Sequence, residues 1–220
     1  MKDELERFLA HARGTAATAK VVSLDELRAP EVTEARWSLA ALRGRLVEVS
    51  ARGATATLTA AIELVVEAQT EREPVAWVTL AQSSFYPPDV AASGVDLAAL
   101  VVIRAPDAIT AARAAERVLR SGAFGLVVID LGGLAASDIT MAIQGRLVTL
   151  AQAHDAAVVC LTDKPGDTPS LGSLVSLRAE ALRGREHGGG FRITVRALKD
   201  KRRGPGWTHA VPRAGPAGLT

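Results

Sequence analysis

The chain has 220 residues, of which 48% are hydrophobic and 23% charged, a balance typical of a packed domain that excludes an intrinsically disordered protein. Its 26 basic and 24 acidic residues give a net charge of +2. The single cysteine, Cys160, excludes a disulfide framework and a cysteine-based structural zinc site, and no apolar run is long enough to span a membrane.

A helical pattern opens the chain. Residues 2–13 place apolar side chains at helical spacing, with charged side chains on the other side. The apolar positions are Leu5, Phe8, Leu9 and Ala12. We expect an N-terminal arm over 1–43, in which the apolar stripe of this helix either folds back on the chain's own core or docks on a partner. The same residues are too charged for a signal peptide, so we expect a cytoplasmic protein.

Short apolar runs alternate with helical patterns over 44–203. Strands are predicted at 46–49, 75–80, 100–103, 125–130 and 156–162, and helices at 56–70, 90–93, 106–121 and 137–154. This alternation is typical of βαβ units, which form a parallel sheet with helices on both faces. We expect Trp37 and Trp77 in the core.

Two later runs, 174–181 and 191–199, are half-polar and adjacent in the sequence. They predict an antiparallel C-terminal edge pair, joined through 184–190. Residues 204–220 are expected to form a flexible tail. The chain is therefore predicted to be an α/β protein in three layers, with a mostly parallel central sheet.

The first strand–loop–helix unit is the place for a phosphate-binding loop, because ligands bind at the carboxyl ends of strands in such sheets. A loop of this kind needs glycines, a lysine for the phosphates and a hydroxyl for Mg²⁺. Here there is no lysine, Gly53 is the only glycine, and Leu58 stands where the hydroxyl is needed. Arg52 either replaces the lysine or is a solvated loop residue. We therefore expect no nucleoside triphosphate, no cofactor and no metal.

Asp130 ends the most apolar strand, where a P-loop ATPase places the aspartate that holds Mg²⁺. Without a phosphate loop opposite, a structural carboxylate is the favoured interpretation of this remnant. The four histidines are scattered and lack carboxylates or cysteines at metal-binding spacing. Cys160 is expected to be a buried small residue in a strand, and not a nucleophile.

Positive charge is concentrated near the end of the sequence. Between Arg178 and Arg213 there are ten lysine and arginine residues against three acidic ones. The densest part contains Lys199, Lys201, Arg202 and Arg203. This run either contacts phosphates of nucleic acid, with Trp207 stacking on a base, or is a solvated basic edge. The low aromatic content of 4% argues against a groove that stacks many bases.

Several segments together resemble the core of the bacterial RecA recombinase. Residues 44–49 match the strand before its phosphate loop, 67–69 match the end of the next helix, and 75–78 match the second strand. Residues 94–100 match the segment leading into the third strand, 120–130 match the strand with the motif aspartate, and 198–201 match a C-terminal lysine pair. Their order and spacing agree over about 45–205, so the resemblance implies a RecA-like three-layer sandwich for most of the chain.

The same register shows what has been lost. The Gly-Lys-Thr of the RecA loop falls on Ala56, Thr57 and Leu58, and the catalytic glutamate falls on Ala81. The first DNA-binding loop is much shorter, and the second is cut to roughly 165–172. The resemblance therefore implies a RecA core without ATPase activity and without most DNA-contacting loops, and so not an enzyme.

A degenerate RecA-like protein of this size resembles the ImuA family. The resemblance implies a role in SOS-induced translesion synthesis, an error-prone DNA repair pathway. The implied partners are an ImuB-like Y-family polymerase homologue and RecA, with an error-prone C-family polymerase indirectly. DNA bound without sequence preference is a further candidate partner, suggested by the basic run and not by the resemblance.

In RecA, the N-terminal helix packs on the neighbouring protomer, and the lysines that match Lys199 and Lys201 reach that neighbour's ATP. The resemblance therefore implies these roles for helix 2–13 and for the two lysines. Two alternatives stay open for the chain as a whole. One is a SulA-like inhibitor of cell division, and the other is an atypical ATPase or DNA-binding modulator of recombination.

Overall fold

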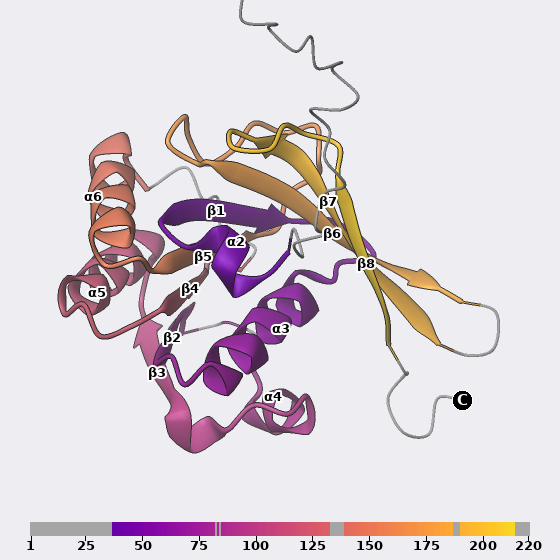
Figure 1. Cartoon of the computed structure of the whole chain (residues 1–220), viewed down its shortest axis with the longest axis horizontal. Helices are drawn as coiled ribbons and strands as arrows, with labels where there is room; N and C mark the ends of the chain where they lie inside the picture. Colours follow the sequence, from indigo (N-terminus) through magenta and orange to yellow (C-terminus); the bar gives the residue numbers. More distant parts are fainter. Residues whose placement is uncertain (1–36, 82, 84, 133–138, 187–189, 214–220) are drawn as a thin grey trace, which may run out of the picture. The chain divides into compact units, whose positions relative to one another are not determined.

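The structure is a computed structural model (Figure 1). It describes residues 37–81, 83, 85–132, 139–186 and 190–213. All of these residues belong to one unit, Ala35–Thr220. The helix predicted at 2–13, with Leu5, Phe8, Leu9 and Ala12, lies outside the described residues.

One mixed sheet carries the fold, and its strands follow the order β3-β2-β4-β5-β1-β6-β7-β8. All neighbours from β3 to β6 are parallel, whereas β6 with β7 and β7 with β8 are antiparallel. The strands are β1 Arg45–Ser50, β2 Val75–Leu80, β3 Leu100–Ala105, β4 Leu126–Asp130, β5 Ala157–Thr162, β6 Leu177–Arg185, β7 Phe191–Asp200 and β8 Thr208–Arg213.

Helices cover both faces of this sheet. The helices are α2 Leu39–Leu42, α3 Thr57–Thr70, α4 Pro87–Ala92, α5 Ala108–Arg120 and α6 Met141–Ala153, with a 3-10 turn at Leu97–Ala99. α2 and α3 contribute to the hydrophobic core on one face, and α5 and α6 contribute to the core on the other. The predicted three-layer α/β architecture, with a mostly parallel sheet and an antiparallel C-terminal edge, is confirmed.

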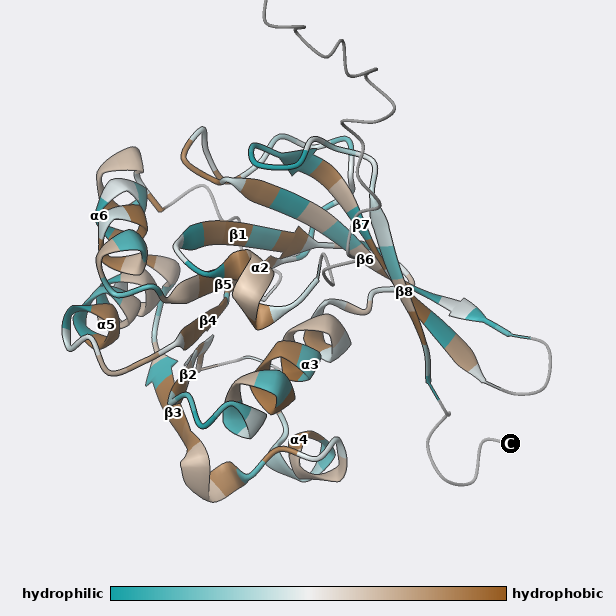
Figure 2. Ribbon diagram, in the orientation of Figure 1, coloured by the Kyte–Doolittle hydropathy of each residue, from teal (hydrophilic) through white to brown (hydrophobic). Residues whose placement is uncertain are grey.

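The four central strands β1, β2, β4 and β5 are buried along their whole length. Because successive side chains of a strand point to opposite faces, a continuously apolar strand supplies both cores. In β1, Val47 and Val49 belong to the core beneath α3, and Leu46 belongs to the core beneath α5 and α6. Figure 2 shows hydrophobic residues in these strands, interrupted in β1 by hydrophilic ones. Trp37 and Trp77 lie in the core beneath α3, as predicted.

The helix predicted at 137–154 is shorter in the structure. α6 begins at Met141, and Thr140 is its N-cap, with a side-chain oxygen that accepts the N–H of Ile143 at 3.5 Å. Ser137, the cap expected from the sequence, lies outside the described residues. In the described part of the chain, no helix is long and apolar enough to cross a membrane.

The C-terminal edge has one strand more than the sequence predicts. Thr208–Arg213 form β8 and pair with β7, so the tail expected over 204–220 is wrong for these six residues. Gly204 and Gly206 have φ values of 77° and 94°, which glycine adopts readily, and they reverse the chain between the two strands. Trp207 then packs into the core beneath α3 and anchors the new strand.

Candidate functional site

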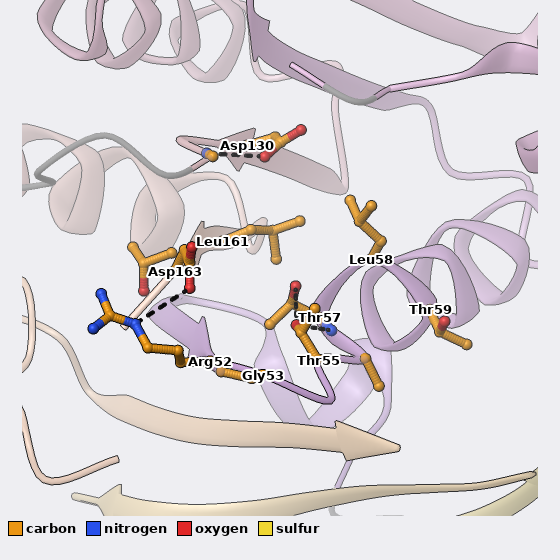
Figure 3. A pocket seen from close by; sticks show the side chains of 13 residues that line it. Arg52, Gly53, Thr55, Thr57, Leu58, Thr59, Asp130, Leu161 and Asp163 are labelled. Carbon is orange, nitrogen blue, oxygen red and sulfur yellow. Dashed lines mark hydrogen bonds and ion pairs between the residues drawn. The ribbon is translucent and has the colours of Figure 1, made fainter. Parts of the chain in front are cut away.

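A hollow of about 440 Å³ lies where the sequence places the degenerate nucleotide loop. It opens at the carboxyl ends of β1, β4 and β5, beside the first turn of α3 (Figure 3). Its lining consists of Ala51, Arg52, Gly53, Thr55, Ala56, Thr57, Leu58, Thr59, Asp130, Gly132, Leu161, Thr162 and Asp163. The structure therefore brings together the loop residues Gly53, Ala56, Thr57 and Leu58 and the strand-end residue Asp130.

The loop before α3 uses its backbone donors within the protein. The N–H of Thr55 donates to the carbonyl of Gly53 at 2.8 Å. The N–H of Ala56 donates to the carbonyl of Ala181 in β6 at 2.9 Å. The N–H of Thr57 donates to Oγ1 of Thr55 at 3.3 Å. A phosphate loop needs such N–H groups to point at its ligand, and three consecutive ones are already taken here.

The side chains of the hollow lack the other groups that a triphosphate needs. Leu58 presents an apolar side chain, 38% exposed, at the position of the metal-binding hydroxyl. Arg52 is directed toward Asp163 (Figure 3), with Nε 3.9 Å from Oδ1 and both side chains largely exposed. An exposed pair at this distance contributes little, about 0–1 kcal/mol, and it holds the guanidinium at the rim. The residues present therefore do not fit a magnesium–triphosphate.

Asp130 is held by three donors of the protein. Its carboxylate accepts hydrogen bonds from the hydroxyls of Thr79 at 3.2 Å and Ser83 at 2.6 Å, and from the N–H of Gly132 at 3.1 Å. The residue is 4% exposed. These contacts tie together the segments that follow β2 and β4, which supports the structural interpretation of this aspartate.

Glu48, which no sequence motif singled out, is the most deeply buried acid near the hollow. It lies in the middle of β1 at 0% exposure, and its carboxylate pairs with Nζ of Lys164 at 2.6 Å. It also accepts hydrogen bonds from the hydroxyl of Thr162 at 3.0 Å and the N–H of Leu171 at 2.8 Å. Burying a carboxyl group without such hydrogen bonds and counter-charge would be costly. The sequence did not indicate that Glu48 pairs with Lys164, because Glu48 lies among apolar residues of a strand.

The segment expected as a shortened DNA-binding loop, residues 165–172, is fastened to the sheet. Arg178 of β6 is 4% exposed and donates to the carbonyl of Pro165 at 2.9 Å. Lys201 donates to the carbonyl of Ser173 at 2.6 Å. Two cations of the basic run thus hold this loop through its carbonyl oxygens.

The basic segment after β7 is organised around a buried acid. Asp200 accepts a charged hydrogen bond from Arg45 at 2.6 Å, and the side chains are 0% and 2% exposed. It also accepts from the N–H groups of Arg202 at 2.9 Å and Arg203 at 3.3 Å, and from Nε1 of Trp207 at 3.0 Å. Burial alone would raise the pKa of Asp200, but these donors outweigh it and hold the pKa below its ordinary value.

Trp207 is therefore not available to stack on a base, and that expectation from the sequence is wrong. It is 6% exposed, its ring belongs to the core, and its N–H is used by Asp200. A tryptophan next to a glycine-rich basic turn suggested a surface residue. The turn instead directs the ring inward, where it packs in the core beneath α3.

The four candidate basic residues have different surroundings. Lys201 and Arg202 are exposed but donate to backbone carbonyls at 2.6 and 3.1 Å. Burial lowers the pKa of Lys199, and the positive charge of Lys201 lowers it further. Arg203 is exposed on the same turn. Contact of Lys199 and Lys201 with a neighbour's nucleotide stays a prediction.

Part of the positive charge in this region is neutralised locally. Three arginines of the strands form ion pairs with glutamates on the surface of the fold. These pairs are Arg192 with Glu186, Arg196 with Glu180, and Arg213 with Glu63. The sequence excess over 178–213 therefore overstates the charge that is left for a partner.

The remaining candidates for chemistry are buried or dispersed. Cys160 is buried in β5, and burial followed by the charge of Glu48 raises the pKa of its thiol, so it is not a nucleophile. Among the described residues, no group of three or more histidine, cysteine or acidic side chains could hold a metal ion. No known family model matches this sequence, and no curated protein matches it either.

Proposed function

We propose that this chain is a non-catalytic RecA-like protein that acts by docking on other proteins. The observation that carries the proposal is the use of the loop N–H groups of Thr55, Ala56 and Thr57 within the fold. The hollow lacks these donors, a lysine and the metal-binding hydroxyl, so it has few groups that could bind a triphosphate.

The resemblance of the sequence to the ImuA family supports a specific setting for this docking role. We infer that the chain is a cytoplasmic accessory protein of SOS-induced translesion synthesis. Its proposed partners are an ImuB-like Y-family polymerase homologue and RecA, with the error-prone C-family polymerase recruited indirectly. Contact with DNA, if it contributes, is expected through exposed basic residues such as Arg203 and is therefore expected to weaken as salt rises.

Co-elution of purified proteins tests this proposal. The full chain is mixed in turn with the ImuB-like protein, with RecA and with the division protein FtsZ, and each mixture is separated by size-exclusion chromatography. We expect a complex with the ImuB-like protein or with RecA, and none with FtsZ. A complex with FtsZ alone would favour the SulA-like alternative, and the absence of any complex would overturn the docking role.

A further inference from the structure

A group of exposed arginines lies on the outer surface of α5 and α6. Arg113, Arg117 and Arg120 follow one another at i, i+4 and i+7 and so share one side of α5. Arg146 joins them from α6, which packs beside α5 on the same face of the sheet (Figure 1). All four are exposed. We call these four residues the arginine face.

Two carboxylates lie near the arginine face: Glu116 within α5, and Asp107, the N-cap of α5, which interacts electrostatically with Arg113. Glu116 is the only acidic residue in α5 and α6, and its side chain is 12% exposed. It binds Arg120 at 2.7 Å and Arg146 at 2.8 Å, and the hydrogen bond from Arg146 is the main reason why its pKa is lowered. Within the described part of the chain, Arg113 and Arg117 make no ion pair and no hydrogen bond through their side chains.

Helix electrostatics account for only part of this arrangement. Arg117 and Arg120 lie in the last turn of α5, where a positive charge is favoured by the helix dipole. Arg113 lies near the middle of the helix, and Arg146 belongs to another helix, so neither gains from that effect. Two guanidinium groups are thus held in place by Glu116, and Arg113 and Arg117 are exposed without a hydrogen bond, a pattern suited to binding carboxylates in pairs.

Exposed apolar side chains lie in the first turns of the two helices that carry the arginine face. Ile109 is 37% exposed in the first turn of α5, and Met141 is 63% exposed at the start of α6. Both helices follow strands of the parallel part of the sheet and begin at the same sheet edge. An apolar end next to a basic side matches a ligand that is itself apolar and acidic.

We propose that the arginine face docks an acidic amphipathic segment of a partner protein. The carboxylates of this segment pair with Arg113 and Arg117, and its apolar side chains cover Ile109 and Met141. A nucleic-acid backbone offers anions but no apolar side chains for that second contact, so the surface favours a protein. The inference rests on the proposed docking role. Its test uses neither ATP nor the ImuB-like protein or RecA, so the peptide site and the proposed function can each fail without the other.

The test measures binding of a synthetic probe to the full chain by fluorescence anisotropy. The probe is an 18-residue labelled amphipathic helix with glutamates at i, i+4 spacing and leucines on the other side. The test variant is Arg113→Glu with Arg117→Glu. The matched control is Arg104→Glu with Arg185→Glu, which makes the same change in net charge at two exposed arginines elsewhere on the fold.

We expect the test variant to bind the probe at least about tenfold more weakly, because like charges then face each other, and the control to change by less than about twofold. A probe with lysines in place of glutamates should bind the test variant better than the parent chain. Equal losses in both variants would show general electrostatic attraction and overturn the proposal. The absence of probe binding would also overturn the proposal. It would be overturned as well if binding of a DNA 30-mer depended on Arg113 and Arg117 while binding of the peptide did not. Both variants should keep the parent's thermal midpoint, because the altered side chains are exposed.

Discussion

Replacing Asp200 with asparagine should strongly destabilise the fold, because it leaves the buried guanidinium of Arg45 without its counter-charge. The two side chains are 0% and 2% exposed and lie 2.6 Å apart, so water cannot replace the lost partner. Removing one member of a buried ion pair costs about 3–5 kcal/mol. Asparagine keeps one acceptor for the N–H groups around Trp207, so we expect a loss of about 3 kcal/mol in the free energy of unfolding.

Urea unfolding followed by circular dichroism and by tryptophan fluorescence measures this loss. A matched control is Asp163→Asn, which removes the exposed, 3.9 Å partner of Arg52 and should cost less than about 1 kcal/mol. Adding Arg45→Met to Asp200→Asn should recover part of the stability, because the unpaired buried charge is then gone. A loss below about 1 kcal/mol for Asp200→Asn would refute the view that this ion pair anchors the end of the sheet.

Three further predictions follow from the buried contacts. Since the pKa of Asp200 is lowered, its contribution is present above the ordinary carboxyl pKa of about 4 and is lost as the pH falls below it, so the difference in urea midpoint between the parent and Asp200→Asn should shrink in acid. Glu48→Gln should lower the free energy of unfolding by about 3 kcal/mol, because Lys164 loses its buried partner. It should also speed proteolytic cleavage of the loop 165–172, which follows Lys164. Gly172→Ala should lower the thermal midpoint and cost about 1–3 kcal/mol, since the added Cβ would clash with the side-chain amide of Gln144, which is itself held by buried hydrogen bonds.

The fold was predictable from the sequence because its signals are local. The strands β1, β2, β4 and β5 are short, mainly apolar runs separated by helical patterns, and such runs indicate buried parallel strands. β8 was missed because Thr208–Arg213 is short, largely exposed and contains Pro212, which the edge of a sheet tolerates. Only the packing of the neighbouring Trp207 shows that this segment returns to the sheet.

The candidate site was only half visible in the sequence. The missing lysine and the leucine at position 58 could be read directly, and they predicted a loop that holds no nucleoside triphosphate. The engaged N–H of Ala56 could not be foreseen, because its acceptor, the carbonyl of Ala181, is distant in the sequence. The role of Asp200 could not be foreseen for a similar reason, since its partner Arg45 lies 155 residues earlier in the sequence.

Isothermal titration of the full chain with ATP and Mg²⁺ measures whether the hollow binds a triphosphate. We expect no saturable heat up to millimolar nucleotide, because the N–H groups of Thr55, Ala56 and Thr57 are used within the protein. Saturable binding in the micromolar range, abolished by replacing Arg52 with alanine, would show that the hollow still holds a triphosphate and that the loop has kept its function.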